Sequence, residues 1–134
     1  MSQIAKTFRE LEIWKLAILI AKQTYALTQQ LPDEERYGLV AQMRRAAISL
    51  SANIAEGFRR QGPKEFRRFL RISLASAAEL ESYCELCCEL FDGHLLQFNE
   101  LLAQLDQFDR MTNTMYTKLR SPSHPVTQSP SHHF

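Results

Sequence analysis

The feature that most constrains the fold is a spacing of three and four residues between apolar side chains, which recurs in four separate segments. This spacing places the side chains on one face of an α-helix. The segments are separated by Pro32, by residues 57–63 and by Asp92-Gly93, which are signals for helix ends and turns. Long helices joined by short connections pack as antiparallel neighbours. The pattern therefore predicts an all-α protein, an antiparallel up-down four-helix bundle within residues 1–120.

The first predicted helix ends at Leu31 and carries two neighbouring apolar rows. One row is Leu11, Trp14, Ile18, Ala21, Tyr25 and Thr28, and the other is Ile13, Ala17, Ile20, Thr24, Leu27 and Leu31. One row is enough to face a bundle core. We therefore expect this helix to bury additional surface against another chain.

The other three predicted helices each carry one core row. The second begins near Asp33 or Glu34, and the third has Pro63 at its first position, where the missing N–H costs nothing. The rows are Val40, Met43, Ala47, Leu50, Ile54 and Phe58; then Phe66, Leu70, Ser73, Ala77, Leu80, Cys84, Cys87 and Phe91; then Phe98, Leu101, Leu105, Phe108, Thr112, Met115 and Leu119.

The composition changes after Arg120. Residues 121–134 contain four Ser, three Pro and three His, and the tetrapeptide Ser-Pro-Ser-His occurs twice. A segment with so few apolar side chains cannot bury a core. We predict that residues 121–134 form a disordered tail.

Neither a membrane segment nor a disulfide framework is indicated. The longest early apolar run, residues 16–21, is far shorter than the roughly 20 residues that cross a bilayer. Three closely spaced cysteines are an odd number and typical of a reducing compartment. We expect a cytoplasmic protein with no membrane partner.

The sequence contains no pattern of residues typical of a catalytic or metal site. Cys84, Cys87 and Cys88 lack the further ligands that zinc requires, and two of them fall on the core row, so we interpret them as buried structural thiols. A glycine-rich phosphate loop, a G-x-S-x-G motif and a Glu-x-x-His pair are all missing. We expect no catalytic residues, no metal, no cofactor and no enzymatic activity.

Polar residues border the core row of the second helix. Asn53 and Glu56 are three residues apart, on the same side as Gln42. They could form a ligand-binding pair, but we favour a structural network of Gln42, Asn53 and Glu56 because buried polar groups generally need such partners.

The charges are distributed very unevenly, although the net charge is only +1. Residues 36–71 contain nine basic and two acidic side chains, a net charge of +7, and this segment includes Arg44, Arg45, Arg59, Arg60, Lys64, Arg67, Arg68 and Arg71. The last four form one stripe at the start of the third helix, while Glu81, Glu85 and Glu89 follow later. This order opposes the helix dipole, at about 0.3–1 kcal/mol for each exposed charge.

Two partners would explain these basic residues. One is a nucleic-acid backbone, for which all eight would be binding residues. The other is the acidic half of the third helix in a neighbouring subunit, which suits a head-to-tail ring. The charge pattern alone does not decide between them.

A longer pattern runs through the second helix and its surroundings. It consists of Leu31-Pro32, Glu35, Tyr37-Gly38-Leu39, Gln42, Arg44-Arg45-Ala46, Ser49 and Asn53-Ile54-Ala55-Glu56-Gly57, with Phe8, Leu11, Trp14, Tyr25 and Thr28 before it and Arg60, Glu65-Phe66, Leu70, Ser76 and Glu79-Leu80 after it. Over residues 8–120 the chain resembles the small four-helix-bundle proteins encoded in intervening sequences of bacterial 23S ribosomal RNA genes. The resemblance implies a homopentameric ring without enzymatic activity. It also implies a relation to the accessory protein of diversity-generating retroelements, which binds nucleic acid and a reverse transcriptase.

Overall fold

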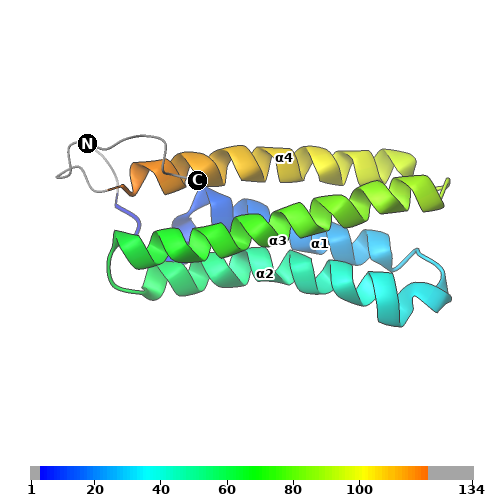
Figure 1. Ribbon diagram of the computed structural model, residues 1–134, viewed down its shortest axis with the longest axis horizontal. Coiled ribbons are helices and arrows are strands. Elements are labelled where there is room, and N and C mark those ends of the chain that lie inside the picture. The colour runs from blue at the N-terminus through cyan, green and yellow to red at the C-terminus, as the bar shows by residue number, and fades with distance from the viewer. Residues whose placement is uncertain (1–3, 121–134) are drawn as a thin grey trace.

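The computed structural model describes residues 4–120 and shows four long helices lying side by side (Figure 1). They are α1 (Glu12–Thr28), α2 (Ala41–Arg59), α3 (Pro63–Leu90) and α4 (Leu95–Lys118). Each helix packs against the next one along the chain, and α4 also packs against α1, which closes the bundle. Residues 4–120 contain no strand. The predicted all-α four-helix bundle is confirmed, whereas the tail predicted at 121–134 lies outside the described residues.

The segment before α2 differs from the continuous helix that was expected to start near Asp33. It contains a 3₁₀-helix at Asp33–Glu35 and then a π-helix at Arg36–Val40, and the regular α-helix begins at Ala41. Another short 3₁₀-helix, Phe8–Glu10, precedes α1. In the segment that connects α1 to α2, the backbone hydrogen bonds therefore span three and then five residues, instead of the four residues of an α-helix.

Only one of the two apolar rows of α1 faces the core. The row of Ile13, Ala17, Ile20, Thr24, Leu27 and Leu31 is buried throughout. In the other row Leu11 and Thr28 are buried, Trp14, Ile18 and Ala21 are half-buried, and Tyr25 is 42% exposed. This second row lies toward α2, where Tyr25 contacts Arg44.

The predicted core rows of the remaining helices are largely buried. All the α3 positions from Phe66 to Cys87 are buried, and so are the α4 positions from Phe98 to Thr112. At the end of α4 the row moves by one residue, because Tyr116 is buried while Met115 and Leu119 are only half-buried. Such a drift is expected because 3.6 residues per turn do not match a strict heptad.

Small residues allow α2 and α3 to approach each other closely. A Cβ atom added at Gly57 would lie 2.6 Å from Phe69 Cβ, so the two backbones meet at this point. The hydroxyl groups of Ser49 and Ser76 are 2.8 Å apart, and Ser73 Oγ donates to the Leu50 carbonyl at 3.0 Å. These bonds satisfy the polar groups at a buried helix contact.

Two carboxyl groups meet where α3 packs against α4. Burial first, and then a hydrogen bond and charge repulsion from Glu81, raise the pKa of Asp109 to about 8. Glu81 Oε2 is buried and accepts no hydrogen bond from the N–H and O–H donors of residues 4–120. A protonated Asp109 supplies the missing donor to Glu81.

The charges of α3 are separated along its length of about 42 Å. Lys64, Arg67, Arg68 and Arg71 lie near its start, with Glu65 among them. The remainder of the helix, residues 72–90, carries four glutamates and no lysine or arginine. The α2–α3 turn, the start of α1 and the end of α4 share the basic end of the bundle (Figure 1).

No helix among residues 4–120 is long and apolar enough to span a membrane.

Candidate nucleic-acid interface

The connection between α2 and α3 gathers six of the eight predicted basic residues at one end of the bundle. Gly62 adopts a positive φ of 90° in this turn, and Pro63 then starts α3. A positive φ is easily adopted by glycine and rarely by other residues. The turn is short, so the end of α2 and the start of α3 lie together (Figure 1). The gathered residues are Arg59, Arg60, Lys64, Arg67, Arg68 and Arg71.

Arg60 and Arg68 both contact the buried ring of Phe69. Their Cζ atoms lie 5.0 Å and 4.6 Å from the ring centroid. Arg60 also pairs with Glu56 at 2.8 Å, and Arg68 pairs with Glu65 at 3.1 Å. The hydrogen bond from Arg68 is the main reason that the pKa of Glu65 is lowered. Both guanidinium groups are therefore held in place on the surface of the turn.

Arg67 connects α3 to the end of α4. Its Nε donates to the Tyr116 carbonyl at 3.3 Å, and its Cζ lies 4.2 Å from the centroid of the Tyr116 ring. The side chain is half-buried. Arg67 therefore stabilises the packing of α3 against α4 and also contributes positive charge to the surface.

A hollow of about 210 Å³ lies between these residues. It is lined by Lys64, Glu65, Arg67, Arg68, Arg71 and Tyr116. Four cationic side chains therefore surround one carboxylate, and Lys64 and Arg71 are exposed at the rim. Such an arrangement favours an anionic group of a ligand, for which phosphate is the natural candidate.

The structure adds a basic residue that the sequence pattern missed. Arg9 and Arg59 both lie over the Phe8 ring, with their Cζ atoms 4.6 Å and 5.5 Å from its centroid. Arg9 is far from the basic segment in the sequence, and only the packing of the N-terminal segment against α2 brings it close. Arg9 lies before the apolar rows that begin at Leu11 and Ile13, and their spacing gives no signal of this contact.

Arg44 and Arg45 do not belong to this cluster. They lie near the start of α2, about 22 Å along the helix axis from Arg59. Arg44 donates hydrogen bonds to α1, at Thr28 Oγ1 and at the Tyr25 carbonyl. The eight predicted basic residues therefore form two groups that are separated by most of the length of α2. A net charge counted along the sequence cannot show this separation.

The predicted polar network of Gln42, Asn53 and Glu56 is also divided. Asn53 Nδ2 donates to the carbonyl and hydroxyl oxygens of Ser49, at 2.9 Å and 2.8 Å. Glu56 is exposed and pairs with Arg60 instead, and Gln42 is exposed without a side-chain hydrogen bond to residues 4–120. The network consists of Asn53 and the serines because these face α3, whereas Gln42 and Glu56 point to solvent.

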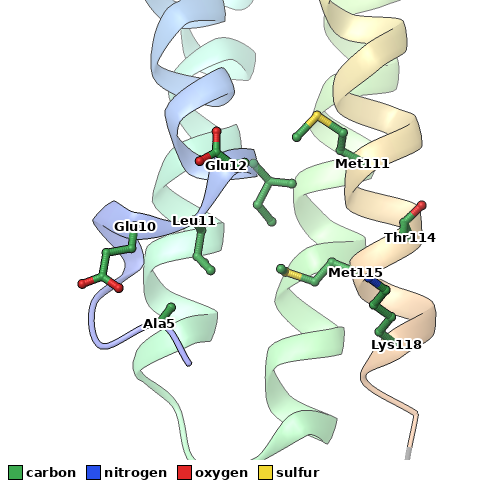
Figure 2. Close-up of a pocket in the computed structure, with 9 residues that line it drawn as sticks. Ala5, Glu10, Leu11, Glu12, Met111, Thr114, Met115 and Lys118 are labelled. Atoms are coloured by element: carbon green, nitrogen blue, oxygen red, sulfur yellow. The ribbon is translucent and has the colours of Figure 1, made fainter. Parts of the chain in front are cut away.

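A larger hollow at the same end of the bundle is apolar. It measures about 460 Å³ and lies between the start of α1 and the end of α4. Figure 2 shows Met111 and Met115 reaching from α4 toward α1, while the Glu10 carboxylate points away from α4. The charged residues that line it are Glu10, Glu12 and Lys118. Two carboxylates and one ammonium group make the lining negative overall. This hollow does not suit a phosphate.

The cysteines lie on the inner side of α3. Cys84 and Cys87 are buried, as predicted, whereas Cys88 is only half-buried. Burial is the main cause that raises the pKa of Cys84 well above its usual range and that of Cys87 to about 11. The Cys87 thiol lies 3.7 Å from the Met43 sulfur. Within residues 4–120, no three His, Cys, Asp or Glu side chains are grouped so that they could hold a metal ion.

Comparisons with known proteins agree with this description of the fold. The family described as "23S rRNA-intervening sequence protein" matches residues 9–114. A protein of unknown function from the S23 ribosomal protein family of Bacteroides thetaiotaomicron has a similar crystal structure, with a TM-score of 0.72 and 21% sequence identity. The match covers 78% of this chain and 95% of that chain. No protein with a curated description matches significantly.

Proposed function

Because the chain belongs to the 23S rRNA-intervening sequence protein family, we propose that it is a non-enzymatic, ring-forming protein that binds a nucleic-acid backbone through the basic end of its bundle. The observation that carries this proposal is the group of Lys64, Arg67, Arg68 and Arg71 around one hollow. Arg59, Arg60 and Arg9 extend the same surface.

The chemistry of this surface favours backbone contacts over base recognition. Guanidinium and ammonium groups are common partners of phosphates, whereas bases are bound by exposed aromatic rings or by groups that reach base edges. Phe66 and Phe69 are buried, and the rings of Phe69 and Phe8 are covered by arginines. We therefore expect binding of single-stranded or structured RNA with little sequence preference.

Assembly into a ring is supported by apolar surface that the single chain leaves exposed. Ile48 on α2 is 48% exposed, and Tyr25 and the half-buried Ile18 lie on the neighbouring α1. The number five comes from the family resemblance. A ring would repeat the basic end around its axis and so multiply the number of phosphate contacts. Light scattering of the purified protein tests this part, and a 15.5 kDa monomer at micromolar concentration would end it.

The test of nucleic-acid binding is the fluorescence anisotropy of a labelled single-stranded RNA. Counterion release predicts a log–log slope with salt of roughly −0.7 to −0.9 for each phosphate that is neutralised. The double variant Lys64→Glu with Arg71→Glu should abolish binding at about 50 mM salt, where such contacts are strong. Lys15→Glu with Lys22→Glu changes the net charge equally on α1 and is the matched control. Absence of binding by the parent protein under these conditions would refute the proposal.

The second candidate function is an oligomeric scaffold for a protein partner such as a reverse transcriptase. Exposed leucines in the acidic half of the bundle favour it, since Leu86, Leu90 and Leu96 are 45%, 55% and 69% exposed. Co-purification with a partner that survives Lys64→Glu with Arg71→Glu, together with no RNA binding by the parent protein, would favour this function over the first.

A further inference from the structure

A hollow of about 380 Å³ lies at the end of the bundle opposite the basic end, where α1 stops and the chain turns into α2. Its walls combine the apolar side chains of Leu31, Pro32 and Val40 with the guanidinium groups of Arg36 and Arg44. Sites for small molecules are typically hollows of about 300–1,000 Å³ with apolar walls and a few convergent polar groups. This hollow has that size and convergent guanidinium groups, and its lining is shared about equally between polar and apolar side chains.

Arg44 is fixed in position at the edge of the hollow. Its Nε donates to Thr28 Oγ1 at 2.9 Å, and its Nη2 donates to the Tyr25 carbonyl at 3.2 Å. Its Cζ lies 4.4 Å from the centroid of the Tyr25 ring. Among residues 4–120, nothing accepts a hydrogen bond from Nη1. A guanidinium group that is held in this way is ready to bind an anion without further ordering.

Arg36 provides a second and more mobile cation. Its Nη2 lies 3.8 Å from Asp33 Oδ1, and both side chains are largely exposed. An exposed ion pair of this length contributes little free energy, so the guanidinium can turn toward a ligand. Two guanidinium groups then face one carboxylate, and the lining of the hollow is positive overall.

A purely structural role for Arg44 explains only part of this arrangement. By bonding to the end of α1, Arg44 adds a hydrogen bond to the Tyr25 carbonyl, which already accepts one from the Gln29 N–H, and offsets the negative end of the helix dipole. That role needs neither Arg36 nor a hollow with apolar walls.

We propose that this hollow binds a small organic phosphate, a phosphate ester carried on an apolar or aromatic body. The phosphate oxygens accept hydrogen bonds from Arg44 Nη1 and from Arg36, because guanidinium groups match phosphate geometry. The apolar body lies against Leu31, Pro32 and Val40. Inorganic phosphate would leave those walls in contact with water and should bind more weakly. The site is separate from the surface proposed to bind nucleic acid.

Isothermal titration calorimetry of the full chain with phenyl phosphate tests the proposal. Inorganic phosphate, benzoate and phenol serve as comparison probes, because they separate the contributions of the phosphate and of the ring. We expect phenyl phosphate to bind about tenfold more tightly than inorganic phosphate or benzoate, and phenol not to bind. Binding of benzoate as tightly as phenyl phosphate would overturn the assignment to a phosphate.

Substitutions then locate the site. Arg36→Ala should weaken phenyl phosphate binding about tenfold with little change in Tm, because Arg36 is exposed and makes only a long ion pair with Asp33 and a distant contact, 6.0 Å, with the exposed Tyr37 ring. Arg45→Ala removes the same charge from an exposed neighbour that does not line the hollow, and it should leave the affinity unchanged. Equal weakening by both variants, or no binding at millimolar phenyl phosphate by the folded parent protein, would overturn the proposal.

Discussion

Gly57 lies directly against Phe69, and a Cβ atom at this glycine would be 2.6 Å from the Phe69 Cβ. The contact involves the base of the Phe69 side chain, so the crowding cannot be relieved by a rotation of the ring. This close contact holds the end of α2 against the start of α3, and the basic end of the bundle depends on that arrangement.

Gly57→Ala should therefore destabilise the bundle. Overpacking costs about 1–3 kcal/mol, and the better helix propensity of alanine returns at most about 1 kcal/mol. We expect a net loss of about 1–2 kcal/mol in the free energy of unfolding, measured by urea denaturation. Gly38→Ala is the control, because no atom lies within 4 Å of its added Cβ. Equal stability of the two variants would show that the helices can separate at no cost.

The carboxyl pair of Glu81 and Asp109 predicts an unusual dependence of stability on pH. The pKa of Asp109 is about 8 in the folded protein, against an ordinary value of 3.8. Between these values the folded state binds more protons than the unfolded state, so this group stabilises at low pH and its contribution is lost as the pH rises toward 8.

Asp109→Asn removes this dependence, because an amide donates a hydrogen bond to Glu81 without titrating. Relative to the parent protein, the variant should gain stability progressively from about pH 4 to pH 8. At about 3 °C in Tm for each kcal/mol, a gain of several degrees at pH 9 is expected from thermal denaturation. A difference in Tm between the two proteins that does not change with pH would contradict the raised pKa.

Arg67 should matter for stability more than its exposed neighbours. Arg67→Lys keeps the charge but loses the Nε hydrogen bond to the Tyr116 carbonyl and the flat contact with the Tyr116 ring. We expect a loss of about 1 kcal/mol in urea denaturation, with RNA binding weakened little. Lys64→Ala should change stability by less than about 0.5 kcal/mol and weaken RNA binding. Unchanged stability in Arg67→Lys would show that Arg67 acts only through its charge.

The three cysteines should react with a thiol reagent at different rates. A thiol with a pKa of about 11, such as Cys87, is ionised in roughly one molecule in a thousand at pH 8, and Cys84 is ionised still less. Only the half-buried Cys88 should react in the folded protein, whereas all three should react in guanidinium chloride. In Cys88→Ser the reaction of the folded protein should disappear. If it persists, the α3 core opens more readily than the packing indicates.

The sequence was sufficient to predict the helices but not how their surfaces combine. Periodicity identified the core positions of α3 because each is buried along one unbroken helix. It could not place Arg44, whose partners Tyr25 and Thr28 lie on another helix, nor show that Arg9 meets Arg59 over Phe8. It also could not reveal that Glu81 faces Asp109, since the pairing depends on the rotation of α3 relative to α4.

The separation of charge along α3 makes the molecule a long electric dipole, although its sequence pI is about 7.8. In the field of a polyanion, such a dipole experiences a torque that points its basic end forward before any contact forms. Approach should therefore be end-on, with the acidic end facing away from the polyanion. A protein that carries almost no net charge can in this way be retained on a cation exchanger near its isoelectric point.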